Sequence, residues 1–153
     1  MIDAHIKWIE LDVYFTKDFV PVVYHGNDDG QFTEEVPEKN ILKSMKVCDV
    51  MYDDICSVDI GGGEKIPSLD ETLKLCQDKI GINIEIKETD PKIVDSVLEL
   101  LYKYHMRQSV FISGFVHPIL QGFEEKTGNE MPTSYLYNNW PTELLPAKEI
   151  YTN

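Results

Sequence analysis

The sequence has few cysteines and few basic residues, and both shortages exclude classes of protein. Three cysteines occur in 153 residues without a C-x-x-C pair, which predicts reduced thiols in a cytosolic setting and argues against a disulfide framework. Lys and Arg number 14 against 27 Asp and Glu, and the net charge of −13 argues against nucleic-acid or anionic-membrane binding. An anionic substrate stays compatible, because a local metal ion or lysine can outweigh the global field.

Long hydrophobic runs are lacking as well. No apolar stretch approaches the roughly 20 residues needed to cross a membrane, and the N-terminus lacks the basic-then-apolar pattern of a secretory signal. The length suits one domain, and 42% hydrophobic residues is an ordinary globular composition. We therefore expect a cytoplasmic protein that acts on a small molecule.

Two segments alternate apolar and polar residues at the period of a β-strand. In the first, near the N-terminus, Glu10 and Asp12 share one face and the apolar residues share the other. In the second, in the middle of the chain, Glu85 and Lys87 share a face in the same way. Carboxylates in such apolar strands need a partner when they are buried, and a divalent cation is one candidate.

The rest of the chain predicts strands that alternate with helices. Ser68 and Glu71 form a capping-box pattern, and Asp90 with Pro91 begins the next helix. Alternation of this kind predicts right-handed βαβ units and a parallel sheet, either open or part of a barrel. The predicted strands cover about residues 7–13, 19–24, 82–87, 109–113 and 133–137, a further helix covers about 117–127, residues 40–60 are ambiguous, and the tail from 140 is weakly structured.

Parallel sheets place functional groups at the C-terminal ends of their strands. If the strands line a barrel, Glu10, Asp12 and Glu85 converge at its mouth, and three carboxylates favour a hard cation such as Mg²⁺ or Ca²⁺. Lys87 would offer positive charge to an anionic group, and His25 is placed for proton transfer near neutral pH. This combination suits hydrolysis of a phosphate ester.

Each of these interpretations has a simpler alternative. Alternation is equally typical of a strand with one face in water, and the pattern alone favours that alternative. A histidine after a strand is more often structural than catalytic. The acidic residues between 28 and 38 indicate a solvated surface, and Gly61-Gly62-Gly63 lacks the ending of a phosphate loop.

At these residues the sequence resembles the glycerophosphodiester phosphodiesterase family. The segment that leads to His25 is similar in sequence to the eukaryotic glycerophosphocholine phosphodiesterases. Five segments match family motifs in order, namely 9–13 with E-x-D, 16–25 with T-K-D-x-x-P-V-x-x-H, 66–73 with I-P-T-L-x-E-x-L, 83–87 with N-I-E-I-K, and 110–115 with V-x-x-S-S-F.

The resemblance implies an α/β fold of the TIM-type (β/α)8 barrel kind and metal-dependent cleavage of glycerophosphodiesters to glycerol 3-phosphate and an alcohol. It implies that Glu10, Asp12 and Glu85 bind a divalent metal, Mg²⁺ or Ca²⁺. It also implies that His25 is one of two acid/base histidines and that Lys87 contacts the substrate phosphate.

The sequence also departs from the family pattern. The H-R-G strand and the E-N helix that precede the metal strand are missing, His5 does not replace the histidine they carry, and Gly26 stands where the family usually has Asp. We therefore expect residues 1–153 to form a partial domain with about strands two to six of the eight. Weak or absent activity and self-association through open sheet edges follow as expectations.

Two other functions stay open at this point. One is a non-catalytic fragment that keeps a metal or phosphate site. The other is a metal-independent α/β module whose acidic strands face water, which a large separation of Glu10 and Glu85 would favour.

Overall fold

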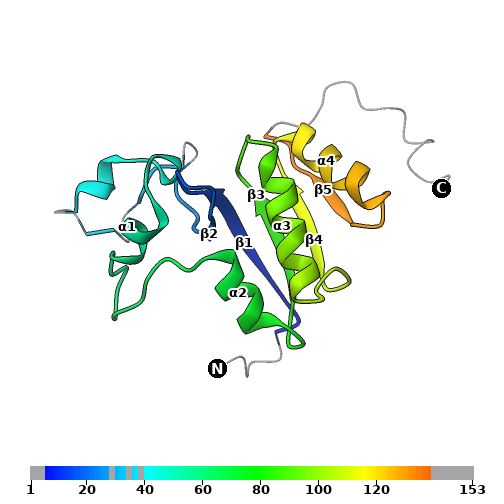
Figure 1. Cartoon of the computed structure of the whole chain (residues 1–153), viewed down its shortest axis with the longest axis horizontal. Helices are drawn as coiled ribbons and strands as arrows, with labels where there is room; N and C mark the ends of the chain where they lie inside the picture. The colour runs from blue at the N-terminus through cyan, green and yellow to red at the C-terminus, as the bar shows by residue number, and fades with distance from the viewer. Residues whose placement is uncertain (1–5, 28–29, 34–35, 38–39, 139–153) are drawn as a thin grey trace.

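A computed structural model describes residues 6–27, 30–33, 36–37 and 40–138. Its central element is a five-stranded sheet in the order β2-β1-β3-β4-β5 (Figure 1). Strands β1, β3, β4 and β5 are mutually parallel, and β2 is antiparallel to β1. The strands are β1 (Trp8–Phe15), β2 (Pro21–Val23), β3 (Gly81–Ile86), β4 (Val110–Gly114) and β5 (Thr133–Tyr135).

Three helices connect the parallel strands, as the alternating pattern predicts. Neighbouring helices contact each other, α2 against α3 and α3 against α4. Figure 1 shows α2 and α3 in front of the sheet, with α4 beside β5. The helices are α1 (Tyr52–Cys56), α2 (Leu69–Cys76), α3 (Lys92–Lys103) and α4 (His117–Thr127), with 3₁₀ turns η1 (Ile41–Ser44) and η2 (Val47–Asp49). Within the described ranges, no helix is long and apolar enough to cross a membrane.

The main hydrophobic core lies between the sheet and these helices, and strand alternation decides which residues enter it. Val13, Ile84 and Ile112 are completely buried on the helix-covered face. The alternate residues of the same strands point to the opposite face, where Glu10 and Glu85 lie. The predicted division of β1 and β3 into an apolar face and a polar face is therefore confirmed.

A second hydrophobic cluster forms on the segment between β2 and α2. Tyr14 from β1 and Val22 from β2 are part of it, together with Ile55 from α1. The segment that was ambiguous in the sequence thus becomes short helical turns that pack around Ile55. The sequence of this segment has no longer helical periodicity. Packing in the second cluster therefore decides the conformation of these turns.

Strand β2 differs from the sequence prediction in its direction. It was counted among the parallel strands, yet Val13 pairs with Val23 and Phe15 with Pro21 in an antiparallel register. A parallel neighbour needs a crossover of a dozen or more residues, and the connection between these strands is a tight turn. That turn holds Phe19 at a φ of 61° and closes through the Thr16 N–H, which donates to the Val20 carbonyl at 3.0 Å. β2 is therefore the second arm of a hairpin.

Helix α2 begins with the predicted capping box. The Glu71 N–H donates to Ser68 Oγ at 3.1 Å, and the Ser68 N–H donates to Glu71 Oε2 at 2.9 Å. Glu71 also forms an ion pair with Lys65 at 2.7 Å. Its hydrogen bond with Lys65, followed by that with the Ser68 backbone, lowers the pKa of Glu71 to about 2.

The low pKa of Glu71 predicts acid-dependent stability. Because the folded-state pKa lies below the ordinary 4.5, its contribution is present above pH 4.5 and disappears as the pH falls toward 2. Glu71→Gln should remove this part of the pH dependence and cost at most about 1 kcal/mol at pH 7, since the side chain is 46% exposed. Urea unfolding between pH 2 and 7 measures it, with exposed Glu99→Gln as control. Identical pH profiles for Glu71→Gln and the wild type would contradict the assignment.

Candidate metal and phosphate site

Three carboxylates meet on the open face of the sheet. Ligand oxygens from Glu10, Asp12 and Glu85 all lie within 4.8 Å of one another. The parallel register of β1 and β3 produces this cluster, because it pairs Asp12 directly with Glu85 and places Glu10 one pleat earlier on the same face. The wide separation that would have favoured a metal-independent module is not what the structure shows.

Lys87 lies among these carboxylates and places its positive charge beside two of them. Its Nζ is 3.2 Å from Asp12 Oδ1 and also forms an ion pair with Glu85 Oε1. The Lys87 backbone is fixed, because its N–H donates to the Val13 carbonyl at 3.1 Å. The sequence-predicted metal residues and the predicted phosphate-binding lysine are thus in one cluster.

The electrostatics of the cluster reflect crowded negative charge. Burial raises the pKa of Glu10, and the charges of Asp12 and Glu85 raise it further. Burial opposes the charge of Lys87, but its hydrogen bonds and charge interactions with Glu85 and Asp12 outweigh burial and raise the pKa of Lys87. The site therefore favours bound positive charge.

This donor set fits a divalent cation. All three groups offer oxygen atoms, which hard cations such as Mg²⁺ and Ca²⁺ prefer. Glu85 Oε1 is buried and, apart from its ion pair with Lys87, accepts no hydrogen bond from the residues that the structure describes. Buried carboxylate oxygens of this kind are costly without a cation beside them.

A cavity of about 460 Å³ adjoins the carboxylates at the C-terminal end of β3. His25 and Lys87 line it together with Tyr14 and Phe115. Lys87 Nζ also lies 5.6 Å from the centre of the Phe115 ring. An anionic group in this cavity would meet an ammonium, an imidazole and two aromatic rings.

His25 reaches this cavity by a different route from the one the sequence suggested. It was placed at the end of a parallel strand, but it follows the antiparallel β2, which returns along β1. The Tyr24 N–H consequently donates to the Asp12 carbonyl at 3.1 Å, so His25 comes next to β1, which carries Glu10 and Asp12. Positive charge at His25, after that of Lys87, offsets a small part of the rise in the pKa of Glu10 that burial and the other carboxylates cause.

The other histidines lie elsewhere in the part of the chain that the structure describes. His117 begins α4, as predicted, and its ring stacks edge-on against Tyr135 and Tyr137 at 5.0 and 4.7 Å. His105 follows α3 at the opposite end of the sheet. His5, which the sequence analysis gave no catalytic role, lies outside the described residues. Sequence reasoning gave neither His105 nor His117 a catalytic role.

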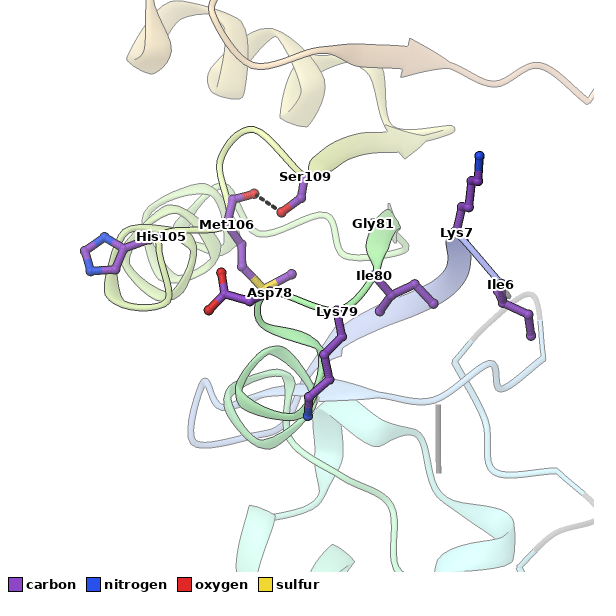
Figure 2. Close-up of a pocket in the computed structure, with 9 residues that line it drawn as sticks. All are labelled: Ile6, Lys7, Asp78, Lys79, Ile80, Gly81, His105, Met106 and Ser109. Atoms are coloured by element: carbon purple, nitrogen blue, oxygen red, sulfur yellow. Dashed lines mark hydrogen bonds between the residues drawn. The ribbon is translucent and has the colours of Figure 1, made fainter. Parts of the chain in front are cut away.

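A second pocket, of about 560 Å³, lies at the N-terminal ends of the strands (Figure 2). Lys7, Lys79 and His105 border it, but Figure 2 shows their charged ends pointing in different directions. No group of three possible metal ligands from the described segments includes them. The carboxylate cluster at the other end of the strands is therefore the candidate functional site.

The structure adds two cavity residues that the sequence analysis did not single out. Tyr14 lies between Val13 and Phe15 in an apolar run, but it follows Asp12 at strand spacing, so strand parity places it on the face of the carboxylates. Phe115 belongs to the fifth motif and follows Ser113 at strand spacing, so strand parity alone could have placed it near Lys87. Ser113 itself donates to Asn83 Oδ1 at 2.8 Å and joins β4 to β3 beneath the site.

Gly114 keeps β4 close to β3 beside the carboxylates. A Cβ at this position would lie 2.8 Å from the Ile86 carbonyl oxygen, which is backbone and cannot turn aside. Gly114→Ala should therefore lower the free energy of unfolding by about 1–3 kcal/mol, as measured by urea denaturation. Gly122→Ala in α4 is the control, because its Cβ would meet only a Val94 side-chain methyl at 3.2 Å. Equal stability of the two variants would show that β4 can move away from the Ile86 carbonyl at little cost.

Comparison with solved structures identifies the fold. A protein of Galdieria sulphuraria assigned as a glycerophosphodiester phosphodiesterase matches with a TM-score of 0.78 and 27% identity, covering 92% of this chain and 57% of that one. The glycerophosphodiester phosphodiesterase of Agrobacterium tumefaciens matches with a TM-score of 0.67 and 26% identity, covering 80% and 51%. A phosphodiesterase of Oleispira antarctica, solved with sn-glycerol-3-phosphate, matches at 0.75 and 21%, covering 90% and 57%.

The chain thus spans little more than half the length of these structures, and its sheet is part of a TIM-type barrel, as the resemblance implied. No curated protein sequence matches the chain significantly. The sequence model of the Glycerophosphoryl diester phosphodiesterase family, however, matches residues 1–143. The chain therefore belongs to the glycerophosphoryl diester phosphodiesterase family.

Proposed function

We propose that the chain binds a divalent metal and hydrolyses glycerophosphodiesters to glycerol 3-phosphate and an alcohol. The observation that carries this proposal is the convergence of Glu10, Asp12 and Glu85 within 4.8 Å beside a cavity that Lys87 and His25 line. Membership of the family supports the reaction class.

Each residue has a distinct role in this proposal. Glu10, Asp12 and Glu85 would hold Mg²⁺ or Ca²⁺, which neutralises charge on the phosphate when bound. Lys87 would bind a phosphate oxygen. His25 would move a proton at the oxygen of the departing alcohol or of the attacking water.

Glycerophosphocholine is the substrate that we propose first. A quaternary ammonium is attracted to aromatic faces, and Tyr14 and Phe115 supply two of these along the cavity. The net charge of −13 also favours a substrate with a cationic end over a nucleic acid. The similarity of the segment that leads to His25 to glycerophosphocholine phosphodiesterases supports the same substrate.

The test is the release of sn-glycerol 3-phosphate from glycerophosphocholine by the purified chain, with Mg²⁺ or Ca²⁺ and after removal of metal with EDTA. We expect metal-dependent but slow turnover, because His25 is the one histidine found at the cavity among the described residues. Loss of one acid or base group typically costs about 10²–10⁴-fold. Metal-independent turnover would contradict the proposal, and a rate typical of the family would contradict the expectation of slowness.

The alternative is a non-catalytic chain that keeps a metal or phosphate site. Its support is that, among the described residues, His25 is the one histidine at the cavity. Calorimetric titration with Mg²⁺ and Ca²⁺ separates the two proposals, because binding without turnover favours the alternative.

We further propose that the chain is cytoplasmic and self-associates through its sheet edge. Its three widely spaced cysteines suit a reducing compartment, and β5 ends the sheet within the described residues. Sedimentation equilibrium tests the association, and a monomer at high concentration would exclude it.

A further inference from the structure

Lys87 occupies the position between Asp12 and Glu85 that a metal ion also requires. Its Nζ is 3.2 Å from Asp12 and in an ion pair with Glu85, and both carboxylates are largely buried, with side chains 8% and 13% exposed. An ammonium and a divalent cation cannot both occupy this small space, because like charges repel strongly where water is scarce.

The surroundings of Lys87 provide one direction in which its ammonium can withdraw. Its backbone is held by Val13, so only the side chain is free to move. Away from the carboxylates lies the 460 Å³ cavity, where the Phe115 ring already contacts the ammonium at 5.6 Å. Cation–π contact would keep the displaced charge in the cavity.

We propose that Lys87 is an exchangeable internal cation, which metal binding displaces from Asp12 and Glu85 into the cavity, so that metal and anion bind cooperatively. The inference rests on the proposed metal site and deepens it. Before displacement, the charge of Lys87 is neutralised by two carboxylates and attracts an anion weakly. After displacement, the same charge faces the cavity. Binding of the metal would thereby create the anion-binding site.

The first test compares Mg²⁺ binding to the wild type and to Lys87→Met by calorimetry. Removal of the competing ammonium should tighten Mg²⁺ binding by a factor within the roughly 5–150-fold range of coupled sites. Lys79→Met changes the net charge equally but lies at the N-terminal ends of the strands, so it measures the general effect of charge. Thermal unfolding of both variants checks that each is folded.

The second test measures inorganic phosphate binding with and without Mg²⁺. Mg²⁺ should strengthen phosphate binding to the wild type, and this enhancement should be smaller in Lys87→Met. A third measurement needs no variant: the side-chain ¹⁵N signal of Lys87 should shift on addition of Mg²⁺, and the signal of Lys79 should not.

The outcomes separate the inference from the proposed function. If Lys87→Met binds Mg²⁺ no more tightly than Lys79→Met, the inference fails and the metal site stands. If no form of the chain binds Mg²⁺, both fail. Tighter binding by Lys87→Met, together with a reduced phosphate enhancement, supports the exchange.

Discussion

Replacing Glu85 with Gln should remove most of the Mg²⁺ affinity and, with it, the hydrolysis of glycerophosphocholine. Glu85 pairs with Asp12 in the register of β1 and β3. Its Oε1 is buried and, among the described residues, has no partner besides Lys87. Loss of an outer-shell partner already costs metal sites roughly 10–100-fold in affinity. Loss of a ligand oxygen should cost more, so we expect binding to fall below calorimetric detection.

The matched control is Glu99→Gln, which makes the same chemical change on an exposed position of α3. Glu85→Gln removes one of three crowded carboxylates but also the ion pair with Lys87, so thermal unfolding of the variant is measured alongside binding. Retained Mg²⁺ affinity in folded Glu85→Gln would show that the metal binds elsewhere. Lost affinity with lost folding would be visible in the thermal unfolding curve.

Replacing His25 with Asn should reduce turnover by roughly 10²–10⁴-fold and leave Mg²⁺ binding intact. His25 lines the cavity but is not among the three converging carboxylates, so we expect its loss to affect the proposed proton transfer and not metal affinity. The measurement is steady-state release of glycerol 3-phosphate at saturating Mg²⁺, paired with calorimetry on the same preparation.

His105→Asn is the control for this substitution. His105 has a φ of 55°, a conformation that Asn tolerates, and it lies at the far end of the strands. Turnover in this control should equal that of the wild type. Unchanged turnover in His25→Asn would refute the proposed proton-transfer role and would leave the metal site untouched.

The sequence predicted the strand faces correctly because alternation is a local property. Glu10 and Asp12 on β1, and Glu85 on β3, needed only the two-residue period to be placed on the open face. Their approach to one another depends on the register between β1 and β3. The βαβ pattern predicts that the two strands are parallel but does not give their register. The match of residues 1–143 to the family model agrees with the resemblance seen in those same segments.

The remainder depended on contacts distant in sequence. The direction of β2 was mistaken although the short turn after Phe15 carried the necessary signal. Strand parity assigned faces but not the cavity itself, because Tyr14 lies in β1 while Lys87 and Phe115 directly follow β3 and β4, and the three meet only when the sheet is assembled. The turns between 41 and 56 likewise take their form from the second hydrophobic cluster.

The described residues form two hydrophobic clusters, and we expect the two to open separately in mild denaturant. Strand β1 belongs to both, since Val13 and Phe15 enter the first cluster and Tyr14 enters the second. Local opening of the second cluster would release Tyr14 and the segment after β2 that carries His25, while the first cluster still held the three carboxylates in register. Metal binding would then outlast the cavity, and mild denaturant would leave a chain that retains its cation without a place for the substrate.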